Sequence, residues 1–305
     1  MDTRLPAEAV ALAEAAQARF DRAGGVDLAR RAEHYEDARA AAGQAFRDVG
    51  GDEVDVRADA EQLVAGAALC RSAGAVVLPW PVVPHLLRSG YARLTLVDPG
   101  DPRVNHGDLP GGWIGTDLDG AAYDLETGAR TRGRLGPFLT RAKLGASRPA
   151  VDADDIARHL VLDAWWALGG LERSLTQLVR HLRDRHQFGA PLADLQSIRF
   201  TTADAAVALR GLEELAKFTA WRVGVAADDR FADAVALRLH AAETARTVLR
   251  TCHQLYGAMG FCDETDLSVV NRHLQPVLRL PHSPERLALR LIPAARDGVL
   301  SGVSR

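Results

Sequence analysis

Apolar residues recur every three or four positions over a long stretch that begins near Asp152. This spacing places them on one stripe of an α-helix, and the acidic first turn, with Asp154 and Asp155, suits the positive end of the helix dipole. The same pattern predicts further helices at about 194–226, 229–258, 264–277 and 283–296, which bury their stripes most simply by antiparallel packing. The first stripe comprises Ile156, Leu160, Ala164, Leu168, Leu171, Leu175, Leu178 and Leu182.

Two regions of different character precede this helical part. Residues 1–90 are rich in Ala, Leu, Arg and Glu at helical spacing, and we expect their helices to be broken at Pro79, Pro81 and Pro84. Residues 91–150 carry short alternating segments such as "YARLTLVDPGD", separated by Gly and Asp turns. The pattern predicts a mainly α protein with a small β domain: an N-terminal helical domain (1–90), the β domain (91–150) and a C-terminal helical bundle (151–305).

Composition narrows the class of partner. The 305 residues are 47% hydrophobic and 25% charged, with a net charge of −3, so we expect a globular protein without a basic face for nucleic acid. No apolar run reaches the roughly 18 residues that a membrane span requires. Three cysteines are too few for a disulfide framework or a thiolate metal site, and Cys252 and Cys262 are expected to be small buried residues. These features predict a cytoplasmic protein with no metal.

Common catalytic motifs are absent from the sequence. There is no Gly-x-Ser-x-Gly turn, Gly-rich phosphate loop, His-Glu-x-x-His or Cys-x-x-Cys pair, so hydrolase, nucleotide-triphosphatase and zinc functions lose their usual support. Two other clusters stand out, "RHQFGAPLADLQ" and "CHQLYGAMGFCDE", at the expected ends of helices. Gly in such places closes a helix or lets the backbone approach another surface closely.

Taken together, the two clusters resemble motifs of the acyl-CoA dehydrogenases. The family's Arg-x-x-Phe-Gly-x-Pro loop and the following Gln are matched by Arg185, Phe188, Gly189, Pro191 and Gln196. Its later Gln-x-x-Gly-Gly-x-Gly-Phe run is matched by Gln254, Gly257, Gly260 and Phe261, with Ala258 in place of the second Gly. The resemblance covers residues 151 to about 275 well. It implies an N-terminal helical domain, a reduced β domain and a C-terminal four-helix bundle, with flavin adenine dinucleotide (FAD) at a subunit interface.

The resemblance also implies a role for each cluster. In the family, these groups reach the flavin of the neighbouring subunit, and an Arg guanidinium suits a pyrophosphate because both form paired, charge-assisted hydrogen bonds. The expected FAD contacts, supplied in trans, are Arg185, Gln187, Phe188, Gln196, Gln254, Gly257, Ala258 and Gly260. Arg272 is a candidate for a phosphate of coenzyme A, with a surface salt bridge as the alternative.

The carboxylate that removes the α proton of the thioester in this family has no clear match. Counting along the motifs puts Pro281 at one family position of the catalytic Glu and a residue near His159 at the other. A shift in register would bring Glu285 or Asp163 into play. The β region also lacks the family segments that cradle flavin and thioester in cis.

By this resemblance, the two retained motifs would contact the flavin of a neighbouring subunit. The missing catalytic Glu and β-domain segments would have formed this chain's own active site. The resemblance therefore implies one subunit of a heteromeric (α2β2) acyl-CoA dehydrogenase for bulky, steroid-type acyl-CoA thioesters, with a homologous partner carrying the catalytic Glu and an electron-transfer flavoprotein or similar acceptor. One alternative is a self-sufficient enzyme that uses His159 as its base. Another is a non-enzymatic helical scaffold, in which Arg185 would sit in an internal salt bridge.

Overall fold

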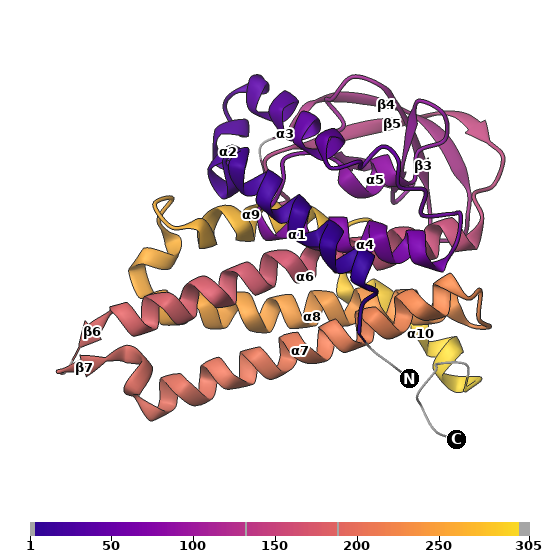
Figure 1. Cartoon of the computed structure of the whole chain (residues 1–305). Helices are drawn as coiled ribbons and strands as arrows, with labels where there is room; N and C mark the ends of the chain where they lie inside the picture. Colours follow the sequence, from indigo (N-terminus) through magenta and orange to yellow (C-terminus); the bar gives the residue numbers. More distant parts are fainter. Residues whose placement is uncertain (1–3, 132, 188, 299–305) are drawn as a thin grey trace.

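The computed structural model describes residues 4–131, 133–187 and 189–298 and is mainly helical, with one small mixed sheet (Figure 1). Three long helices, α6, α7 and α8, lie side by side in one layer, and the N-terminal helices and the sheet cover that layer on one side. The helices are α1 (Ala7–Arg22), α2 (Gly25–Ala32), α3 (Glu36–Asp48), α4 (Ala60–Ala75), α5 (Val82–Leu86), α6 (Ala153–Asp184), α7 (Gln196–Gly224), α8 (Arg230–Tyr256), α9 (Asp266–Arg279) and α10 (Pro284–Arg296).

The sheet has the strand order β1-β3-β4-β5-β2, with β1 and β3 parallel and the other pairs antiparallel. It confirms the expected small β component, and the second half of β5 is largely exposed. Its strands are β1 (Ala92–Leu96), β2 (Arg103–Asn105), β3 (Gly112–Thr116), β4 (Ala122–Arg130) and β5 (Leu139–Arg148).

Helix α6 forms the centre of the molecule because glycines let α4 cross it at close range. A Cβ atom at Gly74 would lie 1.8 Å from the carbonyl oxygen of Trp166, and one at Gly169 would lie 1.9 Å from that of Arg71. The buried apolar side chains of α1 to α10 and of β1 form one continuous cluster around this crossing. The mainly α fold with a small sheet is thus confirmed, and the division at residues 90 and 150 stays a prediction.

The proline-rich segment after α4 behaves largely as expected. Helix α4 ends at Ala75, before Pro79, and α5 begins after Pro81. Pro84 lies within the first turn of α5, where a missing backbone N–H costs nothing, so it does not break a helix. The segment leads the chain from α4 to the sheet.

Candidate functional site

The first motif forms an arm at one end of the long helices (Figure 1). Helix α6 ends at Asp184, and a short hairpin of β6 (His186–Gln187) and β7 (Ala190–Pro191) follows. The backbone N–H of Leu192 donates to the carbonyl of Arg185 at 2.8 Å, which closes the hairpin, and Gly189 has a φ of +81° in its turn. A 3-10 turn, η1 (Leu192–Asp194), then leads into α7. We call residues 185–196 the hairpin arm.

The polar side chains of the hairpin arm point outward. Arg185, Gln187 and Gln196 are exposed, whereas Phe188 lies outside the described residues. Within the described parts of the chain, no carboxylate makes an ion pair with Arg185. The internal salt bridge expected of a mere scaffold is therefore not seen there. An exposed guanidinium of this kind keeps its fork of donors available for an oxyanion.

The second motif ends α8 at the same end of the helical layer. Gly257 has φ +61° and ψ −138°, a conformation that L side chains rarely adopt, and a Cβ there would meet nothing within 4 Å. Gln254, Gly257 and Ala258 are exposed, whereas Gly260 is buried. A Cβ atom added at Gly260 would lie 3.1 Å from the Cβ of Tyr256. We call residues 254–262 the glycine arm; it includes the 3-10 turn η2 (Gly257–Phe261).

A ring stack joins the two arms. The imidazole of His181, in the last turn of α6, stacks on the ring of Tyr256, the last residue of α8, with centroids 4.5 Å apart. Burial, followed by the charge of Arg185, lowers the pKa of His181, so the ring is neutral near pH 7. Burial raises the pKa of Tyr256 to about 12. The motifs are therefore part of one surface.

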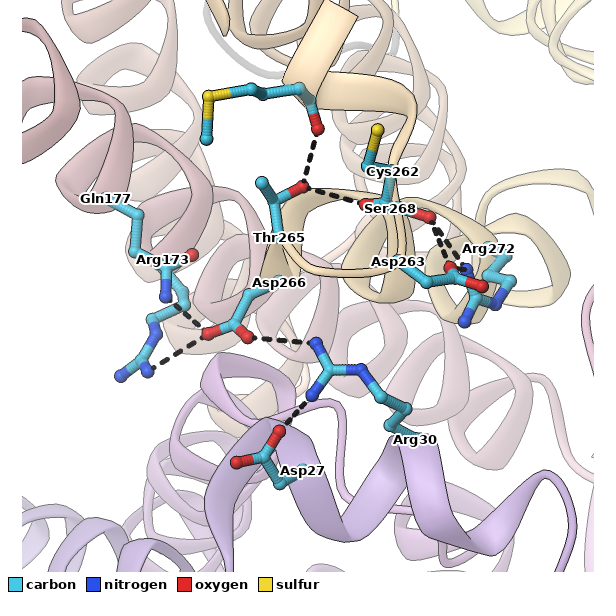
Figure 2. Close-up of polar contacts among 11 residues, drawn as sticks. Asp27, Arg30, Arg173, Gln177, Cys262, Asp263, Thr265, Asp266, Ser268 and Arg272 are labelled. Atoms are coloured by element: carbon cyan, nitrogen blue, oxygen red, sulfur yellow. Dashed lines mark hydrogen bonds and ion pairs between the residues drawn. The ribbon is translucent and has the colours of Figure 1, made fainter. Parts of the chain in front are cut away.

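Hydrogen bonds and ion pairs hold the loop after the glycine arm in place (Figure 2). The Thr265 hydroxyl donates to the carbonyls of Met259 and Cys262, both at 3.1 Å. Asp266, the first residue of α9, accepts from Arg30 of α2 and Arg173 of α6, each at 3.4 Å, and also from Gln177. This Asp266 cluster ties the loop to two other helices and so limits the positions that the glycine arm can take.

Arg272 belongs to a second ion-pair group in the same region. Its Nε donates to Glu33 at 2.9 Å and its Nη1 donates to Asp263 at 2.6 Å. Although burial acts against it, hydrogen bonding from His273 and Arg272 lowers the pKa of Glu33. Of the two roles considered from the sequence, the structure places Arg272 in salt bridges. Its Nε already donates to Glu33 and is therefore not available to a phosphate.

A cavity lies between the sheet, α5, α6 and the end of α9. Its volume is about 60 Å³, and its wall includes His159 and Asp163 of α6, Asn105 and His106 beside the sheet, and Leu280. Ligand pockets usually measure about 300–1,000 Å³, whereas the volume found here is that of about two water molecules. The cavity fits neither a flavin nor an acyl chain.

Two residues considered as alternatives to the missing catalytic Glu, His159 and Asp163, both line this cavity. His159 is 4% exposed, and its Nδ1 lies 3.3 Å from a carboxylate oxygen of Asp163, but the contact lacks hydrogen-bond geometry and neither ring nitrogen has a partner in the described residues. Pro281 is buried next to the cavity residue Leu280, whereas Glu285 is exposed on α10. Of the two carboxylates that a register shift would offer, Asp163 alone lines this cavity.

Sequence reasoning missed the sheet side of this cavity. Asn105 Oδ1 and His106 Nδ1 are both buried and unpaired among the described residues, and burial keeps the pKa of His106 well below its usual value. Asn105 ends β2, a strand of only three residues, and His106 follows it, so the strand is too short for its periodicity to predict where these side chains point. Neither residue belongs to either recognised motif.

The described residues contain no group of three or more His, Cys, Asp and Glu side chains arranged to hold a metal ion. None of their helices combines the length and the apolar character that crossing a membrane takes.

Comparison with known proteins gives consistent matches. The family model "Acyl-CoA dehydrogenase, C-terminal domain" matches residues 142–278. The short-chain specific acyl-CoA dehydrogenase of Rattus norvegicus mitochondria is 36% identical over 101 residues, which cover 32% of this chain and 24% of that protein. The chain's match thus spans about a quarter of the length of that relative.

Two solved structures share the fold over nearly the whole chain. The ChsE4-ChsE5 complex from Mycobacterium tuberculosis superposes with a TM-score of 0.80 at 16% identity, covering 97% of this chain and 99% of that one. The Tcur3481-Tcur3483 steroid ACAD, a G363A variant, gives a TM-score of 0.77 at 18% identity, with 97% and 99% coverage. At these identities the likeness establishes the fold.

Proposed function

Because the chain belongs to the acyl-CoA dehydrogenase family, we propose that it is the subunit of a heteromeric, FAD-dependent acyl-CoA dehydrogenase that contacts the flavin of a homologous partner. The partner would carry the catalytic Glu, in an α2β2 assembly. The exposed and unpaired state of Arg185 among the described residues carries this proposal.

The joined arms support the in-trans role. An isolated exposed Arg is common, but here Arg185, Gln187 and Gln254 are all exposed on two arms that the His181–Tyr256 stack joins. Gly257 leaves open space beside the backbone, which would allow close approach by a ligand such as a pyrophosphate. The residues present therefore fit one face of a bound dinucleotide. Phe188, outside the described residues, stays a sequence-based candidate.

The small inner cavity supports the other half of the proposal. At about 60 Å³ this cavity, which His159 and Asp163 line, is too small to hold a flavin beside them. The partner's pocket would then hold the isoalloxazine, the substrate and the general base. Giving up one of two sites would leave more room for a bulky acyl group, and the steroid ACAD among the structural neighbours makes a steroid-derived thioester the substrate that we propose.

In this mechanism the chain binds and orients. When bound, FAD would supply a hydride acceptor for the β carbon of the thioester. Arg185 would neutralise pyrophosphate charge through paired N–H donors, Gln187 and Gln254 would bind polar edges, and Gly257 would keep the approach free of a side chain. The Asp266 cluster would hold the glycine arm in its binding position, so little ordering would be needed on assembly.

Co-expression with a homologous acyl-CoA dehydrogenase from an adjacent gene tests the proposal. The purified complex should contain FAD, and Arg185→Ala should reduce its FAD content, with a dissociation constant for FAD raised about tenfold or more. Arg141→Ala is a matched control, because Arg141 is an exposed arginine of β5 away from both arms. Absorbance at the flavin bands, per mole of complex, is the measurement.

Three results would contradict the proposal. They are a complex without FAD, an Arg185→Ala complex with unchanged FAD affinity, and this chain purified alone with a full complement of FAD. Turnover with electron-transfer flavoprotein as acceptor, using short and steroid-derived acyl-CoA thioesters, then tests the proposed substrate class. A preference for the short thioester would reject the steroid assignment while leaving the in-trans role standing.

One observation favours a second candidate, a self-sufficient acyl-CoA-processing enzyme. His159 Nδ1 lies 3.3 Å from a carboxylate oxygen of Asp163 at the cavity, close enough for the two to form a base and its orienting carboxylate after a small side-chain rotation. Such an enzyme would turn over a thioester without a partner, and His159→Gln would abolish that turnover. An inactive isolated chain would exclude it.

A further inference from the structure

A second, larger hollow shares the Trp80 side chain with the inner cavity. Trp80 lines both the inner cavity and a groove of about 500 Å³ between α3 and the residues around the sheet. The groove has the size of an ordinary small-molecule site and lies outside the two arms. We call it the outer groove. Its wall consists of Glu36, Asp37, Arg39, Ala40, Arg47, Trp80, Arg93, Asp108, Leu109 and Pro110.

Arg93 is the unusual residue of this groove. Its guanidinium lies over the rings of both Trp80 and Trp113, 5.4 Å from each ring centroid. Nη1 donates to the carbonyl of Pro110 at 3.0 Å, whereas the buried Nε has no partner, and no carboxylate in the described residues forms an ion pair with Arg93. Two indole faces hold the cation by cation–π attraction, and none of the described groups neutralises it.

The wall of the outer groove carries three carboxylates and three guanidinium groups, but arginines already pair with two of the carboxylates. Arg39 binds Asp108 through two hydrogen bonds of 2.8 Å, and Arg130 binds the same carboxylate. Asp37 pairs with Arg31 at 3.2 Å. Arg47 donates to Gln44 and has no ion pair within the described chain. Arg47 and Arg93 therefore face a single uncommitted carboxylate, that of Glu36 at the exposed rim.

The polar atoms of the groove wall are short of acceptors. Nε of Arg39, Nε1 of Trp80 and Nε of Arg93 are all buried donors without an acceptor in the described residues. A buried donor left unpaired costs about 1–3 kcal/mol, so three around one hollow are a departure that calls for an explanation. An oxyanion at Arg93 would supply both the missing charge and an acceptor for its free N–H groups.

We propose that the outer groove binds a small organic oxyanion, with its phosphate or carboxylate on Arg93 and Arg47 and its apolar part along Trp80, Leu109 and Pro110. The site is separate from the proposed flavin contacts and independent of the proposed function. Trp80 also lines the inner cavity beside His159. A ligand in the outer groove that moves this ring would therefore change the shape of the inner cavity.

Calorimetric titration of the full chain tests the site. Inorganic phosphate, adenosine 3′,5′-bisphosphate and hexanoate serve as probes, because the first carries the oxyanion alone and the other two join a phosphate or a carboxylate to a larger group. We expect saturable binding of at least one probe. Arg93→Met, which keeps an unbranched apolar stem but removes the charge and the N–H donors, should weaken binding about tenfold or more. Stronger binding of the bisphosphate identifies a phosphate ligand, and stronger binding of hexanoate a carboxylate ligand.

Two further variants keep the test decisive. Arg47→Met changes an exposed residue of the rim and should weaken binding several-fold even if Arg93→Met fails to fold, whereas Arg250→Met, on an exposed residue of α8, should have no effect. Binding should also change the tryptophan emission, and Trp80→Phe should reduce that change. The proposal is overturned if none of the probes binds, if Arg47→Met and Arg93→Met leave the affinity unchanged, or if Arg250→Met weakens binding as much as they do.

Discussion

The imidazole of His181 lies against the ring of Tyr256, with the centroids 4.5 Å apart and the ring planes 21° from parallel. This contact joins the end of α6 to the end of α8, and with them the hairpin arm to the glycine arm. An aromatic stack of this kind contributes about 0.5–1.5 kcal/mol beyond the area that it buries. Its larger effect would be on the relative position of the two arms.

We expect Tyr256→Leu to lower the FAD content of the assembled complex, because the arms would lose their fixed spacing. Tyr256→Phe should retain FAD, since it keeps the ring and removes a hydroxyl whose pKa of about 12 leaves it neutral anyway. Flavin absorbance of the two complexes, compared at equal subunit stoichiometry, gives the answer. Equal retention by both variants would mean that the stack has no positioning role.

The close crossing of α4 and α6 predicts a large difference between two Gly→Ala changes. Gly169→Ala would place a Cβ 1.9 Å from the Arg71 carbonyl oxygen and should cost about 3 kcal/mol of unfolding free energy. Gly211→Ala is the matched control, because it lies in α7 with nothing within 4 Å of the added Cβ, and should stabilise by about 0.5–1 kcal/mol. Urea unfolding of both variants measures the difference.

Most of the helical fold was predictable, because each long helix carries an apolar stripe. The predicted ends differ by about two residues for local reasons: Leu192–Asp194 forms a 3-10 turn after Pro191, and Gly257 ends α8 with a positive φ. Strand β5 was not predicted individually, because most of its residues are exposed, and buried and exposed positions alternate only in part.

The candidate site was predictable only as two separate motifs. Their meeting through His181 and Tyr256 depends on how α6 and α8 rotate against each other, which spacing along one helix does not determine. The inner cavity combines His159 of α6 with Asn105 and His106, some fifty residues earlier in the chain. Cys262, expected to be buried, is exposed because it follows η2 at the surface.

The cysteines give a direct test of this part of the structure. Cys70 and Cys252 are buried and Cys262 is exposed. Burial raises the pKa of Cys252 to about 12 and that of Cys70 well above its usual value, so neither should form a thiolate readily. A thiol reagent at pH 8 should modify one cysteine quickly in the folded chain and all three in denaturant. Cys262→Ser should remove the fast phase.

Acid should destabilise the protein partly through His106. Burial, with Arg39 and His273 acting in the same direction, keeps the pKa of folded His106 well below 6.5, and Asp108 opposes this only in part. The unfolded chain takes up a proton near pH 6.5 and the folded chain does not. The contribution to stability is therefore complete above pH 6.5 and declines below it, by up to about 1.4 kcal/mol per pH unit.

Urea unfolding between pH 7.5 and 5 measures this effect. His106→Asn should flatten the dependence of unfolding free energy on pH, whereas His34→Asn, a change of an exposed residue, serves as the matched control. An unchanged pH dependence in His106→Asn would show that His106 does not stay neutral in the folded chain.

The bond between Arg30 and Asp266 joins residues 236 positions apart. Through this bond α2, near the N-terminus, supports the glycine arm, which lies near the C-terminus. A shortened version that begins after α2 would retain every residue of both recognised motifs and still present a loosened glycine arm. Searches for the minimal cofactor-contacting fragment should therefore start upstream of the motifs, at the helix that steadies them.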